Sequence, residues 1–121
     1  SNARDLFSLK IKGSFLYHLP DLLHLNTDDL ADIFGISRAK YYRLLKENQL
    51  DIAIVDVLAA FLKLWNKGLI AFDGNDESFR TWLNAPNHNI GDIEPLQLMK
   101  TETGRREVEA ALDRIEYSVY G

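Results

Sequence analysis

Residues 82–121 read W-L-N-A-P-N-H-N-I-G-D-I-E-P-L-Q-L-M-K-T-E-T-G-R-R-E-V-E-A-A-L-D-R-I-E-Y-S-V-Y-G, and this stretch decides the fold. Pro86 stops a short helix, because proline lacks a backbone donor and disfavours helical geometry before it. Pro95 suits the first position of a second short helix. Thr101 suits the cap of a terminal amphipathic helix. The apolar stripe of that helix is Val108, Ala111, Leu112 and Ile115.

A long apolar helix precedes this lobe. Asp51 caps it, and Lys67 lies near its end, where Gly68 closes it at the position after the last turn. Apolar side chains cover nearly all of its faces, which predicts a helix at the centre of the core. Any apolar face that one chain leaves uncovered would form the seam of a homodimer.

Two shorter helices come before it. Gly35 ends the first and Ser37 caps the second, which is the spacing of a helix-turn-helix. Phe15 to Leu25 predicts another helix that restarts at Pro20. Arg4 to Lys12 fits a strand or a helix, and we favour a helix. We therefore expect an all-α fold, a helix-turn-helix bundle followed by a small helical C-terminal lobe.

Composition narrows the class of protein. The 121-residue chain has no cysteine, which excludes disulfides and thiolate metal sites. No apolar run approaches the roughly 20 residues that span a bilayer. Nothing resembles a signal peptide, and Ser1 to Ala3 look like the remnant of an expression tag. We expect a soluble cytoplasmic protein that has no contact with a membrane.

The charge balance changes at the turn-rich residues 72–76. Residues 1–72 hold nine Lys or Arg against eight Asp or Glu, whereas residues 73–121 hold five against ten. An acidic C-terminal half disfavours nucleic acid there and suits a basic protein partner. We therefore predict two domains, at residues 4–72 and 73–121.

The second helix of the helix-turn-helix is basic. In such a motif this helix enters the major groove, where Arg reads guanine and Lys and Tyr bind phosphates. An acidic protein would gain affinity for DNA from dimerisation and from a focused patch. The alternative is a scaffold helix with a solvated basic face. The predicted DNA-binding residues are Ser37, Arg38, Lys40, Tyr41, Tyr42, Arg43 and Lys46.

No constellation of residues suits catalysis or metal binding. The three histidines lack ligand-like spacing, and the cluster Asp28, Asp29 and Asp32 suits the start of a helix. The sequence has no phosphate-binding loop and no nucleophile motif. We predict no enzyme activity, no cofactor and no metal.

The chain ends in contact groups. Tyr117, Val119 and Tyr120 lie in or beyond the last helical turn, and tyrosine is enriched at the centres of interfaces. The competing interpretation is a frayed terminus.

The C-terminal lobe also carries an ordered set of motif residues: Trp82-Leu83, Pro86-Asn87, Ile90-Gly91, Pro95-Leu96-Gln97-Leu98, Thr101-Glu102, Gly104, Val108, Leu112, Arg114-Ile115-Glu116-Tyr117 and Val119-Tyr120. In order and spacing this set resembles the toxin-binding domain of Xre/MbcA/ParS-type antitoxins. The sequence G-I-S-R-A-K-Y-Y-R-L-L-K at Gly35 to Lys46 is similar to the Xre-like DNA-binding domain of the same family.

The resemblance implies an antitoxin whose partner is a RES-domain toxin that consumes NAD. The antitoxin would cover the toxin's active site and repress its own operon by binding promoter DNA. The NAD chemistry belongs to the toxin, so no cofactor site is assigned here. The implied toxin contacts are Pro86, Asn87, Arg114, Tyr117, Ser118, Val119 and Tyr120.

Two positions depart from the family pattern. Asp92 replaces the second glycine of a pair, so we expect no positive φ there. Ser118 replaces a glycine and is expected to stiffen the tail or change its direction. The alternatives to an antitoxin are a stand-alone DNA-binding regulator whose C-terminal lobe serves dimerisation, and a carboxylate-based enzyme. A RES-type toxin gene beside this one would favour the antitoxin.

Overall fold

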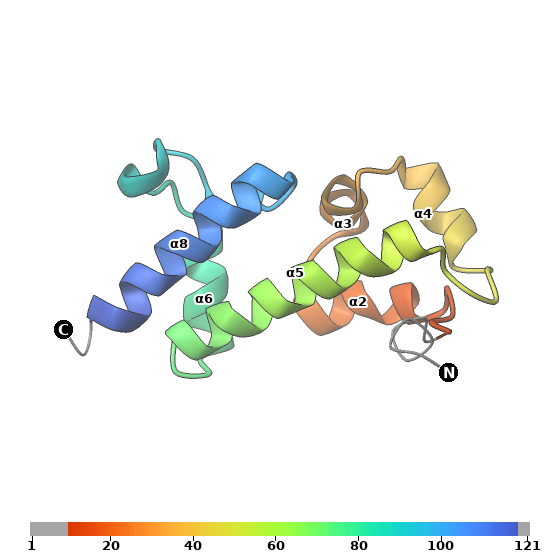
Figure 1. Ribbon diagram of the computed structural model, residues 1–121, viewed down its shortest axis with the longest axis horizontal. Helices are drawn as coiled ribbons and strands as arrows, with labels where there is room; N and C mark the ends of the chain where they lie inside the picture. The colour runs from red at the N-terminus through yellow and green to blue at the C-terminus, as the bar shows by residue number, and fades with distance from the viewer. Residues whose placement is uncertain (1–9, 119–121) are drawn as a thin grey trace, which may run out of the picture. The chain divides into compact units, whose positions relative to one another are not determined.

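The computed structural model describes residues 10–118, and over these residues the chain is helical without a strand, which confirms the predicted all-α class. Figure 1 shows the order of the helices along the chain. The chain divides into two compact units, Ser1–Ala59 and Ala60–Gly121. The division falls inside the longest helix, α5 (Ile52–Ala71), which therefore contributes residues to both units.

The first unit contains α2 (Phe15–Leu23), α3 (Thr27–Phe34) and α4 (Arg38–Leu44). Helix α3 ends at Gly35, where φ is 69°. Helix α4 begins after Ser37, whose hydroxyl oxygen accepts a hydrogen bond of 3.0 Å from the Lys40 amide. The two helices thus lie where the sequence predicted them, joined by three residues.

Helix α2 runs unbroken through Pro20, so the predicted restart at this residue is wrong. A proline inside a helix cannot donate to the carbonyl four residues earlier, which here belongs to Leu16. The phenol of Tyr41 on α4 donates to that carbonyl at 2.6 Å, and both residues are buried. Packing against α4 therefore satisfies the acceptor that proline leaves open.

The predicted helix over Arg4 to Lys12 is wrong where it is described, since residues 10–12 are not helical. Residues 4–9 lie outside the described part of the chain. The Ile11 carbonyl accepts a hydrogen bond of 2.7 Å from the Leu50 amide, and the Gly13 amide donates to the Glu47 carbonyl at 2.9 Å. These bonds hold the segment beside the connection between α4 and α5.

Asp51 caps α5 as predicted, because its Oδ1 accepts a hydrogen bond of 3.0 Å from the Ile54 amide. Gly68 does not end the helix, however, which continues to Ala71. Gly68 is buried, and a Cβ atom at this position would lie 2.1 Å from the Phe79 ring. The glycine serves the close approach of Phe79, not a helix terminus.

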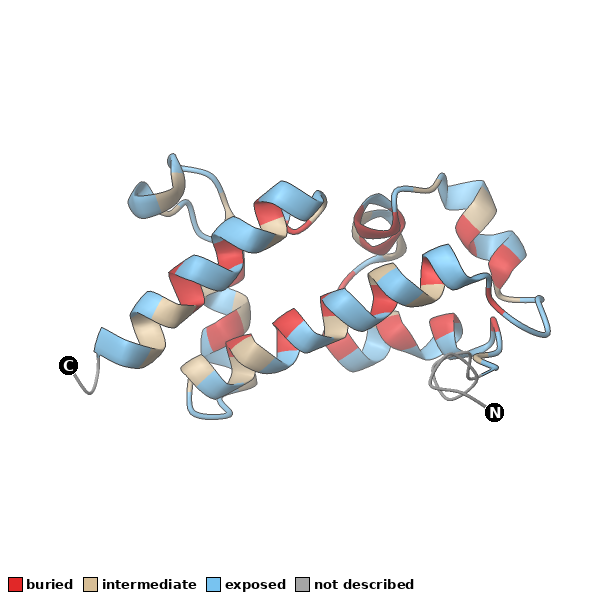
Figure 2. Cartoon of the chain, viewed as in Figure 1, coloured by how far each residue is buried: buried red, intermediate tan, exposed pale blue. Residues whose placement is uncertain are grey.

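The second unit adds α6 (Asp76–Leu83), the 3₁₀ helix η1 (His88–Ile90), α7 (Pro95–Leu98) and α8 (Glu102–Ser118). Thr101 caps α8 as expected, with its hydroxyl oxygen 2.9 Å from the Gly104 amide. Buried and exposed residues follow one another along α5 and α8, so each helix has one buried face (Figure 2). The core of this unit includes Phe61, Trp65, Phe79, Leu83, Leu96, Met99, Val108 and Leu112.

Candidate functional site

Asn87 organises the turn between α6 and α7. Its backbone amide donates to the Ile93 carbonyl at 3.1 Å, and its carbonyl accepts from the Asp92 amide at 2.9 Å. Its side-chain Oδ1 accepts from the Asn89 amide at 2.9 Å. The side-chain oxygen of this predicted contact residue is therefore used within the turn. Pro86, the other predicted contact here, is exposed.

Asp92 adopts a φ of 59° directly after Gly91 at 85°, so the expectation that Asp92 needs no positive φ is wrong. Two successive left-handed residues return the chain from η1 to the bridge between Asn87 and Ile93. Aspartate occupies this region more readily than most residues other than glycine. Asp92 therefore holds a backbone conformation that glycine would adopt without strain.

Ile93 is an exposed apolar side chain that the sequence reasoning missed. The antiparallel bridge to Asn87 fixes its backbone at the base of the turn. The available signal was an isolated isoleucine between two acids, Asp92 and Glu94, immediately after a turn.

The end of α8 presents the other predicted contacts. Arg114, Tyr117 and Ser118 are exposed, and 65% of the Tyr117 surface is accessible. The Ser118 hydroxyl donates to the Ile115 carbonyl at 3.1 Å, which fastens the last helical turn. Val119 and Tyr120, which were also predicted, lie outside the described residues.

The turn and α8 belong to one unit, and η1 lies against α8. Helix α8 is also tied to the second part of α5, because the Lys67 ammonium pairs with Asp113 and lies 4.0 Å from Glu109. The hydrogen bond to Asp113 raises the pKa of Lys67. The predicted contacts on α8, Arg114, Tyr117 and Ser118, thus lie on a helix that ion pairs join to α5.

In the first unit, three side chains form a connected group at the start of α4. The Arg38 guanidinium lies 5.8 Å over the Tyr42 ring, and its Nε is 3.5 Å from Asp28 Oδ1. The hydrogen bond from Arg38 lowers the pKa of the Tyr42 hydroxyl, and a second bond with Thr27 acts in the same direction. Both Arg38 and Tyr42 remain exposed.

Tyr41 must be removed from the predicted DNA-binding set. Only 1% of its surface is exposed, and burial raises its pKa to about 12. Its protonated hydroxyl is committed to the Leu16 carbonyl. Adjacent residues on a helix point about 100° apart, so Tyr42 faces outward when Tyr41 faces inward.

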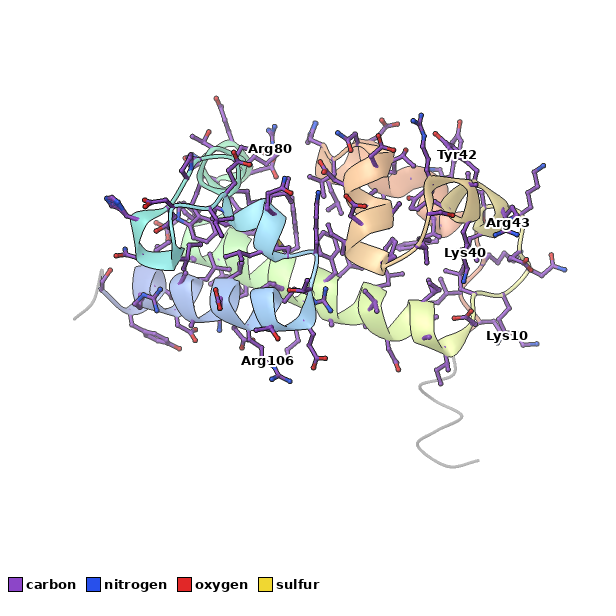
Figure 3. The ribbon with its side chains drawn as sticks, turned by 90° about the horizontal axis from the view of Figure 1, so that it is seen from above. Lys10, Lys40, Tyr42, Arg43, Arg80 and Arg106 are labelled. Atoms are coloured by element: carbon purple, nitrogen blue, oxygen red, sulfur yellow. The ribbon has the colours of Figure 1, made fainter. Side chains whose placement is uncertain are left out.

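The other predicted DNA-binding residues lie at the surface of the first unit. Ser37, Arg43 and Lys46 are exposed, whereas Lys40 is half-buried. Figure 3 shows Lys40, Tyr42 and Arg43 on α4, with Lys10 toward the same end of this unit. Lys10 was not predicted as a site residue.

Within residues 10–118, no three histidine or carboxylate side chains are grouped so that they could hold a metal ion. In the same part of the chain, none of the helices combines the length and the apolar character needed to cross a bilayer.

The family comparison falls within the second unit. Residues 68–117 match the antitoxin Xre/MbcA/ParS C-terminal toxin-binding domain. A curated protein named antitoxin Xre, from Yersinia enterocolitica serotype O:8 / biotype 1B, is 30% identical over 63 residues, which are 52% of this chain and 43% of that protein. The chain therefore spans less than half the length of this relative. The matched domain encloses Pro86, Asn87, Arg114 and Tyr117.

Proposed function

We propose that this chain is an Xre/MbcA/ParS-type antitoxin that neutralises a RES-domain toxin, which consumes NAD. The match of residues 68–117 to the toxin-binding domain of that family supports the proposal. The antitoxin covers the entrance to the toxin's active site and supplies no catalytic group itself. It also represses its own operon in the cytoplasm. The observation that carries the proposal is an ordered turn and an exposed Tyr117 within the matched domain.

The toxin-binding surface consists of the turn and the end of α8. Pro86 and Ile93 present apolar groups at the turn, while Arg114 and Tyr117 project from the helix. The turn is already closed by the hydrogen bonds of Asn87, so binding orders few additional groups and loses less conformational entropy. Tyr117 is the anchor, since a large aromatic side chain buried at an interface centre is a typical hot spot.

The toxin-binding proposal is tested by co-expression with the neighbouring toxin gene. Tyr117→Ala is expected to weaken the complex by at least about tenfold and to reduce the rescue of growth. Tyr17→Ala is the matched control, because Tyr17 is 69% exposed and Tyr117 is 65% exposed. Equal binding by both variants would contradict the role of Tyr117. A partner that, once separated from the antitoxin, does not consume NAD would contradict the RES assignment.

Repression is proposed to act through α4. Arg38 lies at its start beside Asp28 and Tyr42, with its guanidinium exposed and within reach of DNA. We expect Arg38 to contact a guanine and Arg43 to contact a phosphate. Arg38→Ala together with Arg43→Ala should abolish promoter binding in a mobility shift and leave toxin neutralisation intact. Unchanged promoter binding would refute the assignment of α4.

Operator binding by a helix-turn-helix usually requires two copies, and we propose that this antitoxin is a homodimer. Ile52, Val55 and Ala59 follow one another at intervals of three and four residues on α5, so they share one face. Ile52 and Ala59 are exposed and Val55 is half-buried. This face is the part of the predicted seam that the chain itself leaves uncovered.

A further inference from the structure

A second basic segment lies beside the connection from α4 to α5. Lys10 and Lys12 flank Ile11, whose carbonyl accepts a hydrogen bond from the Leu50 amide at 2.7 Å. The Gly13 amide donates to the Glu47 carbonyl at 2.9 Å. Both lysine side chains are exposed. Backbone pairing therefore holds the segment that carries these two lysines next to a part of the chain that is more than thirty residues away in sequence.

Cationic side chains outnumber carboxylates around residues 10–12 and the connection from α4 to α5. Asp51 and Glu47 are the carboxylates of the neighbouring connection, and Asp51 already caps α5 through the Ile54 amide. Apart from Arg38, which pairs with Asp28, five cations lie on residues 10–12, on α4 and on the connection after it: Lys10, Lys12, Lys40, Arg43 and Lys46. The whole chain carries a net charge of −4, so this concentration of positive charge is local.

We propose that Lys10 and Lys12 form a phosphate-binding flank that grips the backbone of duplex DNA beside α4, irrespective of base sequence. The inference rests on the proposed binding of DNA by α4 and extends it to a second segment. Lysine is a compact charge on a long stem, so it suits phosphate contact without a fixed orientation. Such contacts position a protein on the duplex, whereas contacts to base edges select the sequence.

Duplex DNA is the occupant that the observations favour, because Lys10 lies toward the same end of the first unit as Lys40 and Arg43 of α4 (Figure 3). A groove-binding helix is normally accompanied by phosphate contacts from segments on either side of it. An anionic lipid surface would also attract lysines, and the experiment separates these two partners.

The test compares Lys10→Ala/Lys12→Ala with the wild type by fluorescence anisotropy. The probes are the promoter duplex and a scrambled duplex of equal length, each at several salt concentrations between about 50 and 200 mM. Each phosphate contact contributes about 0.9 to the slope of log affinity against log salt. The slope should therefore become shallower by about 2 per chain, with a loss of affinity on the order of tenfold for both duplexes.

The matched control is Lys63→Ala/Arg106→Ala, which removes the same charge from exposed positions outside this segment. It is expected to keep the wild-type slope. Lys10 and Lys12 expose their side chains, so circular dichroism should show an unchanged fold for the test variant.

Three results would overturn the inference. The first is an unchanged slope, and the second is a loss confined to the promoter duplex, which would indicate base readout. The third is intact binding to both duplexes with lost binding to phosphatidylserine vesicles, which would assign the flank to a lipid surface. Failure of the wild type to bind either duplex would refute DNA binding by α4 as well. If the wild type binds DNA and only the result for Lys10→Ala/Lys12→Ala differs from the expected one, DNA binding by α4 is not contradicted.

Discussion

At the scale of single residues, Asp92 holds a left-handed backbone, with φ at 59°, where glycine would be unstrained. This conformation costs a residue with a Cβ atom about 1 kcal/mol. Asp92→Gly should therefore raise the free energy of unfolding in urea by about 1 kcal/mol. The ion pair lost with His88 is solvent-exposed and worth little. Asp92→Ala is the control, because it removes the carboxylate but keeps the strain; a glycine variant no more stable than the alanine variant would contradict this account.

Tyr41 and Pro20 are coupled through the backbone carbonyl of Leu16. Tyr41→Phe leaves the buried Leu16 carbonyl without its donor, which should cost about 1–3 kcal/mol of unfolding free energy. In a Pro20→Ala background a backbone amide is available to the same carbonyl, so the loss should shrink. A double-mutant cycle by urea denaturation measures the difference. Equal losses in both backgrounds would show that the phenol does not substitute for the missing amide.

The orientation of Tyr41 and the backbone conformation of Asp92 could not be predicted from the sequence. Helical spacing assigned Tyr41 and Tyr42 to one basic surface, yet only a neighbouring helix decides which of them turns inward. That neighbour is α2, whose open carbonyl at Leu16 takes the Tyr41 hydroxyl. Asp92 was similarly misjudged, because residue type suggested an ordinary φ whereas closure of the turn demanded a left-handed one.

At the scale of helices, α7 and α8 meet so closely that no side chain fits between them at Gly104. A Cβ atom there would lie 1.9 Å from the Leu98 carbonyl oxygen. Gly104→Ala should force the helices apart and destabilise the fold by about 1–3 kcal/mol, despite alanine's better helix propensity. Thr103→Ala, at an exposed position on the same helix, should change stability by less than about 0.5 kcal/mol. Urea denaturation distinguishes the two variants, and similar stability of both would refute the close approach.

Three helix beginnings were predicted correctly, and the cause of each is local. Ser37, Asp51 and Thr101 each accept the amide three residues later, a bond that needs nothing beyond its own turn. Gly68 and Pro20 were misread, because their roles depend on contacts from other helices. Locally each is a helix stop or start, whereas in the fold each lies within a continuous helix.

At the scale of the whole molecule, the uncovered face of α5 predicts that the protein has the mass of a dimer in solution. Light scattering should give twice the 13.9 kDa of one chain at micromolar concentration. Ile52→Glu should shift that mass to the monomer, since a carboxylate in an apolar seam loses its hydration. Leu22→Glu is the matched control, because Leu22 is 65% exposed and Ile52 is 66% exposed. A wild-type mass equal to one chain would contradict the dimer. An equal decrease of mass in both variants would contradict the placement of the seam at Ile52.

The residues of the C-terminal surface could be predicted from the sequence more completely than those of the basic surface. The C-terminal one followed from a motif with fixed spacing, and Pro86, Asn87 and Tyr117 all fall within the matched domain. The basic surface that we propose extends beyond the predicted residues, because backbone pairing places the segment of Lys10 beside the connection after α4. The domain boundary after residue 72 stays a prediction. The compact units divide between Ala59 and Ala60, and the matched domain begins at residue 68.

The shared helix α5 has a consequence for anyone who would exchange toxin specificity between antitoxins by building chimaeras. A graft that starts at residue 68, where the matched domain begins, would omit Phe61 and Trp65. Trp65 packs against both Phe61 and Phe79, with ring centroids 5.7 and 5.0 Å apart. The transplanted lobe would then arrive with a hole in its aromatic core. A splice ahead of Phe61, within one uninterrupted helix, would carry the whole core with it.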